Sequence, residues 1–217
     1  MDHFPPTLPT LASRLPALKS RSSCRGFTIV GNRVVVFESH LELMVIWMLA
    51  AMSEVATIID QPPPVSYLDH AGVERTHTFD FLVTMRDGRR LFIAVKPAKR
   101  ARKVRAVANA IAAQLAAGIA DEVHVVTDAN FTRTERYNAS LIAQCARFPV
   151  TEDDETIDRI TARMTGAVKV GDLVEISGLA GMGFRAIMRL IGRGLLQPVA
   201  TRQRLTTNSY IVRRPSI

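Results

Sequence analysis

The chain has 217 residues, of which 47% are hydrophobic and 22% are charged, and this composition excludes an intrinsically disordered protein. Its net charge of +8 favours a polyanionic partner, nucleic acid first, although a basic charge can also serve solubility alone. The two cysteines and five histidines form no zinc-binding motif, and the most apolar run, Leu43 to Met52, is too short for a membrane-spanning helix. With no secretory signal pattern at the N-terminus, we expect a cytoplasmic protein without a membrane partner.

In chain order, the first feature is a segment of four prolines among serine and arginine residues at 1–25, which we expect to form a flexible arm. A basic arm that contacts DNA is the alternative. The β-branched run at 33–37 then predicts a strand. Ser39 followed by Glu42 forms a capping-box pattern, which predicts a helix over 40–53.

Six further elements are predicted before the composition changes. They are three strands in a meander, an Ala-rich helix, a strand and a final helix, at 65–68, 77–85, 90–96, 98–117, 122–127 and 133–148. This order predicts an α/β domain over residues 26–149, in which a mixed sheet is flanked by helices.

The acidic stretch at 151–155 marks the expected boundary of a second, small domain over 150–217. Three helices are predicted there, with a tight turn over 180–183 before the third, and two strands follow. Their ranges are 154–164, 171–178, 184–193, 195–200 and 208–213. Helices followed by a strand hairpin are typical of a winged helix-turn-helix domain.

Asp80 and Lys96 are the candidate chemical groups of the larger domain. The Asp87-Gly88 turn pairs the two strands that carry them, and this pairing brings Asp80 close to the end at Lys96. A carboxylate can hold Mg²⁺, and a lysine ammonium can offset charge that develops on a phosphate. An ordinary surface hairpin with one acid and one base is the alternative reading of this spacing.

Several motifs together resemble a known nuclease family. They are FESHLELMVIWML, IIDQPPPVSY, RTHTFDFLV, a D-G turn and LFIAVK, within residues 33–148. This set is similar to the N-terminal nuclease domain of TnsA-type transposase endonuclease subunits, in the PD-(D/E)xK superfamily. The resemblance implies a restriction-endonuclease-like fold and divalent-metal-dependent DNA cleavage beside a DDE transposase.

The same resemblance implies roles for individual residues. Glu38, Asp80 and Lys96 are the implied catalytic residues, with Gln61 as an accessory position. Glu38, Asp80 and the Val95 carbonyl are the implied ligands of Mg²⁺ or Mn²⁺.

The sequence departs from the family pattern at two positions. Phe79 stands where the family has proline, and Ala94 stands where it has Glu or Gln. Because a methyl group binds no metal, Ala94 weakens the implied site. It remains open whether Glu42 or Glu74 compensates for this change.

Two basic clusters are candidate DNA-binding surfaces. The first precedes and begins the Ala-rich helix, where basic side chains oppose the helix dipole; it contains Lys99, Arg100, Arg102 and Lys103. The second comprises the third C-terminal helix, with Arg185, Arg189 and Arg193 on one face, and the wing, with Arg202 and Arg204. Solvated basic faces, or a winged helix that binds protein, are the alternatives.

The favoured hypothesis is a metal-dependent DNA endonuclease, associated with the nucleoid, that acts on double-stranded DNA. A DDE transposase or another subunit would be its protein partner, and a homodimer would supply two active sites. A catalytically impaired nuclease fold that acts as a DNA-binding or regulatory protein is the second hypothesis. A subunit whose C-terminal domain docks another protein is the third.

Overall fold

The computed structural model describes residues 7–14 and 24–215, which pack as two compact units. The N-terminal unit comprises the described residues of Pro5–Leu49 and Glu54–Phe131. The C-terminal unit comprises Ala50–Ser53 and the described residues of Thr132–Ile217. No helix among the described residues is long and apolar enough to cross a membrane.

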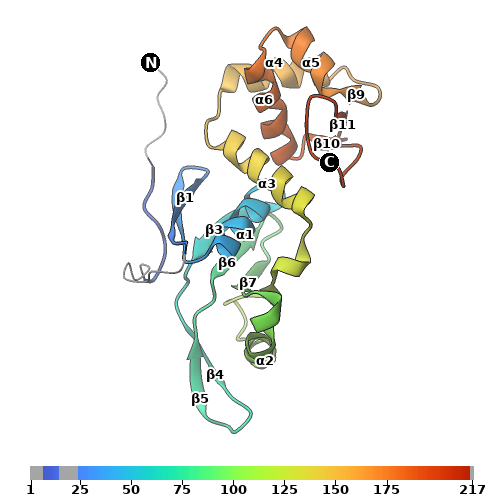
Figure 1. Ribbon diagram of the computed structural model, residues 1–217. Coiled ribbons are helices and arrows are strands. Elements are labelled where there is room, and N and C mark those ends of the chain that lie inside the picture. Colours follow the sequence, from blue (N-terminus) through green and yellow to red (C-terminus); the bar gives the residue numbers. More distant parts are fainter. Residues whose placement is uncertain (1–6, 15–23, 216–217) are drawn as a thin grey trace. The chain divides into compact units, whose positions relative to one another are not determined.

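A four-stranded mixed sheet forms the centre of the N-terminal unit (Figure 1). Its strands, in spatial order, are β3 (Val55–Asp60), β6 (Phe81–Met85), β7 (Arg90–Val95) and β8 (Glu122–Val126). The first three are antiparallel neighbours, whereas β8 runs parallel to β7. The mixed α/β architecture predicted from the sequence is therefore confirmed.

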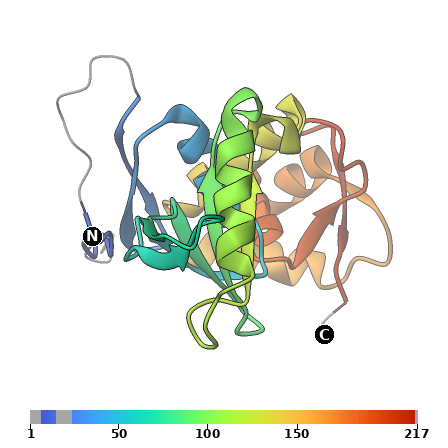
Figure 2. The ribbon, with the colours of Figure 1, turned by 90° about the horizontal axis from the view of Figure 1, so that it is seen from below.

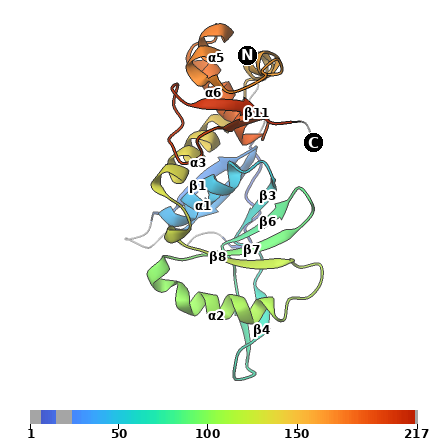
Figure 3. The same cartoon turned by 90° about the vertical axis from the view of Figure 1, so that its right-hand side faces the viewer.

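Helices cover both faces of this sheet, with α1 (His40–Ala50) on one side and α2 (Ala101–Ala112) on the other (Figure 3). Because neighbouring residues of a strand point to opposite faces, Ile93 packs in the cluster with α1 while Phe92 packs in the cluster with α2. Figure 2 shows α2, in green, lying along the sheet. The helix expected over 98–117 is shorter at both ends. A 3-10 turn (Ala98–Arg100) precedes α2, and α2 already ends at Ala112.

Two hairpins lie outside the central sheet. One joins β1 (Gly26–Val30) to β2 (Arg33–Phe37), and the other joins β4 (Val65–Leu68) to β5 (Glu74–His77). The predicted meander is therefore wrong at its first strand. The strand beside β6 is β3, which we did not predict, and β4 pairs only with β5. The predicted strand 77–85 is divided, because the backbone between β5 and β6 leaves the ladder.

Residues 7–14 of the predicted arm pack along the N-terminal unit. Leu8 exchanges backbone hydrogen bonds with the hairpin, donating to Asn32 at 2.7 Å and accepting from Val34 at 3.0 Å. The Thr10 hydroxyl donates to the buried Asp60 carboxylate at 2.7 Å. Most of the rest of the arm lies outside the described residues, so its flexibility stays a prediction.

The C-terminal unit contains four helices and a three-stranded antiparallel sheet among its described residues. In chain order these are α3 (Arg133–Ala146), α4 (Thr151–Thr161), β9 (Val168–Lys169), α5 (Val170–Ser177), α6 (Gly181–Gly192), β10 (Leu196–Pro198) and β11 (Tyr210–Arg213). Its core gathers apolar residues from every helix and from the hairpin, including Ile157, Leu173, Ile187, Leu190 and Ile211.

The turn between α5 and α6 is tighter than predicted. Gly178 ends α5 in the left-handed region at φ 68°, and α6 already begins at Gly181. Gly183 lies inside α6, where a Cβ atom would meet the Ser177 hydroxyl at 2.8 Å, so glycine permits the close approach of the two helices. The two compact units divide between Phe131 and Thr132, because α3 packs with the C-terminal unit. The domain boundary expected at 149/150 stays a prediction.

Candidate active site

Asp80 lies at the start of β6, and the structure brings it to Lys96 as predicted. The Asp80 amide donates to Ile93 at 3.0 Å, and this bond fixes the residue beside β7. Its Oδ2 atom accepts from the Val95 amide at 2.6 Å and lies 3.5 Å from the Lys96 ammonium. Asp80 is buried, while the Lys96 side chain is 38% exposed. The pair therefore opens to solvent on the lysine side.

The Val95 carbonyl lies on the same side of β7 as the Asp80 carboxylate. In a strand, the amide and carbonyl of one residue point in the same direction. Because the Val95 amide donates to Asp80 rather than to a strand partner, its carbonyl also points past the start of β6. The Val95 carbonyl oxygen and the Asp80 carboxylate therefore lie on the same side of β7, where both could bind one ligand.

Glu42 is a second buried carboxylate at this site. Its Oε2 atom accepts from the Glu38 amide at 2.7 Å, and its Oε1 atom accepts from the Ser39 hydroxyl at 2.9 Å. Burial raises the pKa of Glu42, the charge on Asp80 raises it further, and Lys96 opposes the rise. Glu42 therefore interacts electrostatically with both members of the predicted pair.

Glu38, the carboxylate expected from the resemblance, has a different environment. Its side chain is 24% exposed and lies 3.4 Å from the Arg14 guanidinium. The sequence explained Glu42 as a helix cap and left open whether it compensates for Ala94, and the structure shows the capping contacts. The spacing of four residues places Glu38 and Glu42 one helical turn apart. This spacing was the signal in the sequence that both carboxylates could lie near the same site.

Gln61 lies beside Asp80 in a strained backbone conformation. Its φ angle is 43°, in the left-handed region that a residue with a side chain seldom adopts. The Gln61 amide donates to the Asp80 carbonyl at 2.9 Å, and its own carbonyl accepts from Ser13. The side chain is 2% exposed. Strain of this kind gathers at functional sites, so the geometry supports an accessory role for Gln61.

His77 also lies near the pair, and the sequence analysis missed it. Burial lowers the pKa of His77, Asp80 opposes the change, and Lys96 adds to it. Its ring stands edge-on to Phe79 at 4.8 Å between centroids, and its Nε2 atom is buried without a hydrogen-bond partner among the described residues. An imidazole whose pKa is lowered by burial therefore lies close enough to Asp80 and Lys96 to feel their charges.

Ala94, on β7 directly before Val95, is fully buried. It is 1% exposed and packs with Phe79, Leu82 and Phe92. No three acidic, histidine or cysteine side chains gather as a metal cluster in the described part of the chain. Asp80 and Glu42 influence each other electrostatically, and together with the Val95 carbonyl they would offer only oxygen atoms, the ligands that Mg²⁺ or Mn²⁺ prefers.

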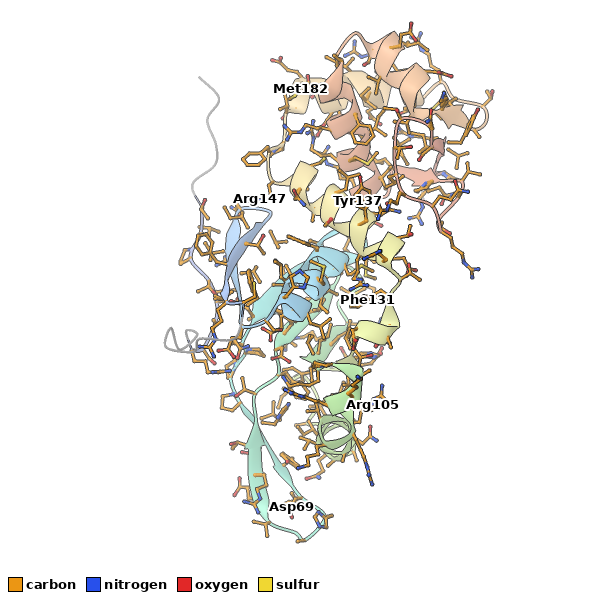
Figure 4. All side chains as sticks on the ribbon, in the orientation of Figure 1. Asp69, Arg105, Phe131, Tyr137, Arg147 and Met182 are labelled. Atoms are coloured by element: carbon orange, nitrogen blue, oxygen red, sulfur yellow. The ribbon has the colours of Figure 1, made fainter. Side chains whose placement is uncertain are left out.

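The first predicted basic cluster is fully exposed. Lys99, Arg100, Arg102 and Lys103 are all exposed, and none pairs with an acidic side chain among the described residues. Arg105 projects from the same helix (Figure 4). The cluster begins three residues after Lys96, within the same unit.

The second cluster is not one exposed face. Arg189 is 2% exposed, and its Nε atom donates to Asp154 at 2.6 Å. Arg193 also binds Asp154, at 2.5 Å. The expected outward face of α6 is therefore wrong at Arg189, because α4 packs on that face and supplies the carboxylate. Arg185, Arg202 and Arg204 are exposed.

Comparison with known families agrees with the resemblance. Residues 52–137, less than half of the chain, match the model of a family described as TnsA-like endonuclease N terminal. The matched segment includes Gln61, Asp80 and Lys96. This finding confirms the TnsA-like nuclease resemblance for that segment. No match was found among the curated proteins.

Proposed function

We propose that this protein is a metal-dependent DNA endonuclease of the transposase-associated, TnsA-like type. The observation that supports it most is the Asp80–Lys96 pair, which lies 3.5 Å apart within the segment that matches the family. A TnsA-like domain suggests a nuclease of this type with DNA as the substrate. Metal dependence and strand cleavage are the parts that we propose.

Each residue of the site has a proposed role. Asp80, Glu42 and the Val95 carbonyl would hold Mg²⁺ or Mn²⁺, whereas Glu38 would remain paired with Arg14 outside this set. The bound ion would polarise the phosphate and lower the pKa of a water molecule. Lys96, positioned by Asp80, would offset the charge that develops on the phosphate. Gln61 would fix the backbone on which Asp80 depends.

The basic start of α2 would bind the DNA backbone beside this site. Its side chains are exposed and pair with no acidic side chain in the described part of the chain, and they begin three residues after Lys96. Cations at a helix N-terminus oppose the helix dipole, so their concentration there is better explained by an anionic ligand than by helix stability.

The C-terminal unit has the element order of a winged helix-turn-helix, which is helix, strand, helix, helix and two strands from α4 to β11. We propose that it contributes to DNA binding and that a DDE transposase is the protein partner. One site cleaves one strand, so double-strand cleavage would require a homodimer or a second nuclease. A nucleoid location in the cytoplasm would follow from this activity.

A catalytically impaired nuclease fold that only binds DNA is the second candidate function. Ala94 favours it, since a buried methyl group replaces a ligand that the family pattern supplies. Under this alternative the site retains its fold and its basic surface without cleaving DNA.

The deciding experiment incubates the purified chain with supercoiled plasmid in Mg²⁺ or Mn²⁺, beside EDTA and an Asp80→Asn variant. Nicking that vanishes in both controls supports the endonuclease. Salt-sensitive binding without nicking favours the impaired fold. Activity gained by Ala94→Glu would show that the site lacks a third ligand.

A further inference from the structure

The connection between β10 and β11, residues 199–209, has a defined shape, and we call it the wing segment. Both polar atoms of the Asn138 side chain, on α3, bind the backbone of the wing segment. The Nδ2 atom donates to the Gln203 carbonyl at 2.9 Å, and the Oδ1 atom accepts from the Leu205 amide at 2.9 Å. Leu205 is 2% exposed and packs into the core of the unit. The wing segment is therefore anchored at its middle, so its outward side chains are presented in fixed positions.

The outward side chains of the wing segment belong to residue types that commonly contact phosphate and sugar. Arg202 and Arg204 are exposed, and the Arg204 guanidinium stacks on Tyr137 at 4.7 Å. Beside them is a pocket of about 220 Å³, lined in part by Gln203, Asn208, Ser209 and Tyr210. Arginine, amide and hydroxyl groups make most protein contacts to the DNA backbone.

The charge around the wing segment is positive. The chain has seven arginines and no acidic residue from Ile176 to its last residue. Glu135 on α3 interacts with Arg202, but its carboxylate already accepts from the Thr132 amide and hydroxyl. Arg202 and Arg204 therefore remain without a hydrogen-bonded acid among the described residues.

Helix α6 exposes fewer arginines that no acid binds among the described residues than the wing segment does. Arg189 and Arg193 are held by Asp154, which leaves Arg185 as the exposed arginine of this helix that no acid binds among the described residues. The helix start exposes Met182 (Figure 4), and the preceding helix exposes Ile176 at 68%. Asp172 and Glu175, also exposed on α5, would repel phosphates.

We infer that the C-terminal unit binds the backbone of duplex DNA through the wing segment, with Arg202 and Arg204 as phosphate contacts, and not through α6. This inference rests on the proposed function only in taking DNA as the substrate. It reverses the usual arrangement of helix-turn-helix domains, in which the second helix of the motif enters the major groove.

The test measures binding of the full chain to a labelled duplex by fluorescence anisotropy, in EDTA, between about 50 and 200 mM salt. We expect Arg202→Gln with Arg204→Gln to bind at least about tenfold more weakly at the higher salt, because both proposed phosphate contacts are lost. The slope of log K against log salt should become shallower by about 1.8, since each phosphate contact contributes about 0.9. Arg185→Gln, the matched control on α6, should bind within about twofold of the wild type.

Two further measurements keep the result interpretable. Arg204→Lys with Arg202→Lys keeps both charges and should restore most of the salt slope, and thermal unfolding should show that every variant remains folded. A double glutamine variant that binds like the wild type would overturn the inference and leave the wing segment as a protein-docking surface. A larger loss with Arg185→Gln would also overturn it. Because binding is measured without metal, absence of nicking would contradict the proposed cleavage and leave this inference standing.

Discussion

The Oδ2 atom of Asp80 accepts a hydrogen bond from the Val95 amide at 2.6 Å, so the carboxylate takes the place of a strand partner for the end of β7. The same atom lies 3.5 Å from the Lys96 ammonium. The position of the end of β7 and the charge beside Lys96 therefore both depend on Asp80, whose Oδ1 atom accepts no hydrogen bond within the described ranges.

Asp80→Asn should abolish metal-dependent nicking, with a loss of at least about a hundredfold, because an amide is a poor ligand for Mg²⁺ and no longer pairs with Lys96. The amide oxygen can still accept from Val95, so the fold should persist. Plasmid nicking checks the activity and thermal unfolding checks the fold. Unchanged nicking by the folded variant would refute a role for Asp80 in cleavage.

Glu42→Gln and Glu38→Gln form a matched pair one helical turn apart. We expect Glu42→Gln to lose nicking about a hundredfold, because it removes the carboxylate that interacts with Asp80 and Lys96. Glu38→Gln loses only an exposed pair with Arg14 and should keep activity within about threefold. The nicking rates of both variants at several Mg²⁺ concentrations make the comparison.

The reverse ranking, in which Glu38→Gln is inactive and Glu42→Gln active, would show that Glu38 leaves Arg14 to bind the metal. The glutamine oxygen at position 42 can accept from the Glu38 amide while its NH2 group donates to the Ser39 hydroxyl, so the start of α1 should be preserved. Equal melting temperatures would exclude a folding defect as the cause of either result.

Local patterns in the sequence predicted most elements, but they predicted strand pairing only within a hairpin. Strands β4, β7 and β8 and helices α3 to α6 lie close to their expected ranges, because each has a clear period or a clear boundary residue. Strand β3 was missed, since Val55–Asp60 follows directly after an apolar helix and reads as its continuation. Asp60 on β3 pairs with Phe81 on β6 across the 20 intervening residues 61–80, and such a long-range contact leaves no local signal.

The part of the site that the sequence predicted is the pair of functional side chains carried by a single hairpin. Asp80 and Lys96 are brought together by the turn between β6 and β7, and this pairing follows from the sequence. Glu42 and His77 reach the site only through packing of α1 and of the second hairpin, and burial gives them their electrostatic role. Arg189 was predicted to face outward and is buried instead. Helical spacing alone does not distinguish an exposed arginine from one that a neighbouring helix covers.

Asp154→Ala should strongly destabilise the C-terminal unit. It leaves the buried Arg189 guanidinium without its carboxylate, and removal of one partner of a buried pair costs about 3–5 kcal/mol. Asp158→Ala is the matched control on the same helix, since Asp158 is 44% exposed and pairs with Arg213 near the surface. Its loss should cost less than about 1 kcal/mol. Denaturant unfolding of both variants measures the difference, and equal effects would contradict a structural role for the buried pair.

The start of α3 should make stability depend on acid pH. Hydrogen bonds from the Thr132 amide and hydroxyl lower the pKa of Glu135 below its usual value of 4.5. A lowered pKa means that the native state binds this proton less readily than the unfolded state, so the cap contributes stability above pH 4.5 and loses it as pH falls through the native pKa. Glu135→Gln should reduce the fall in melting temperature over that acid range, while Glu152→Gln, on the first turn of α4, serves as an exposed control. Melting curves that fall equally for the wild type and Glu135→Gln would show that the capping box carries no pH-dependent stability.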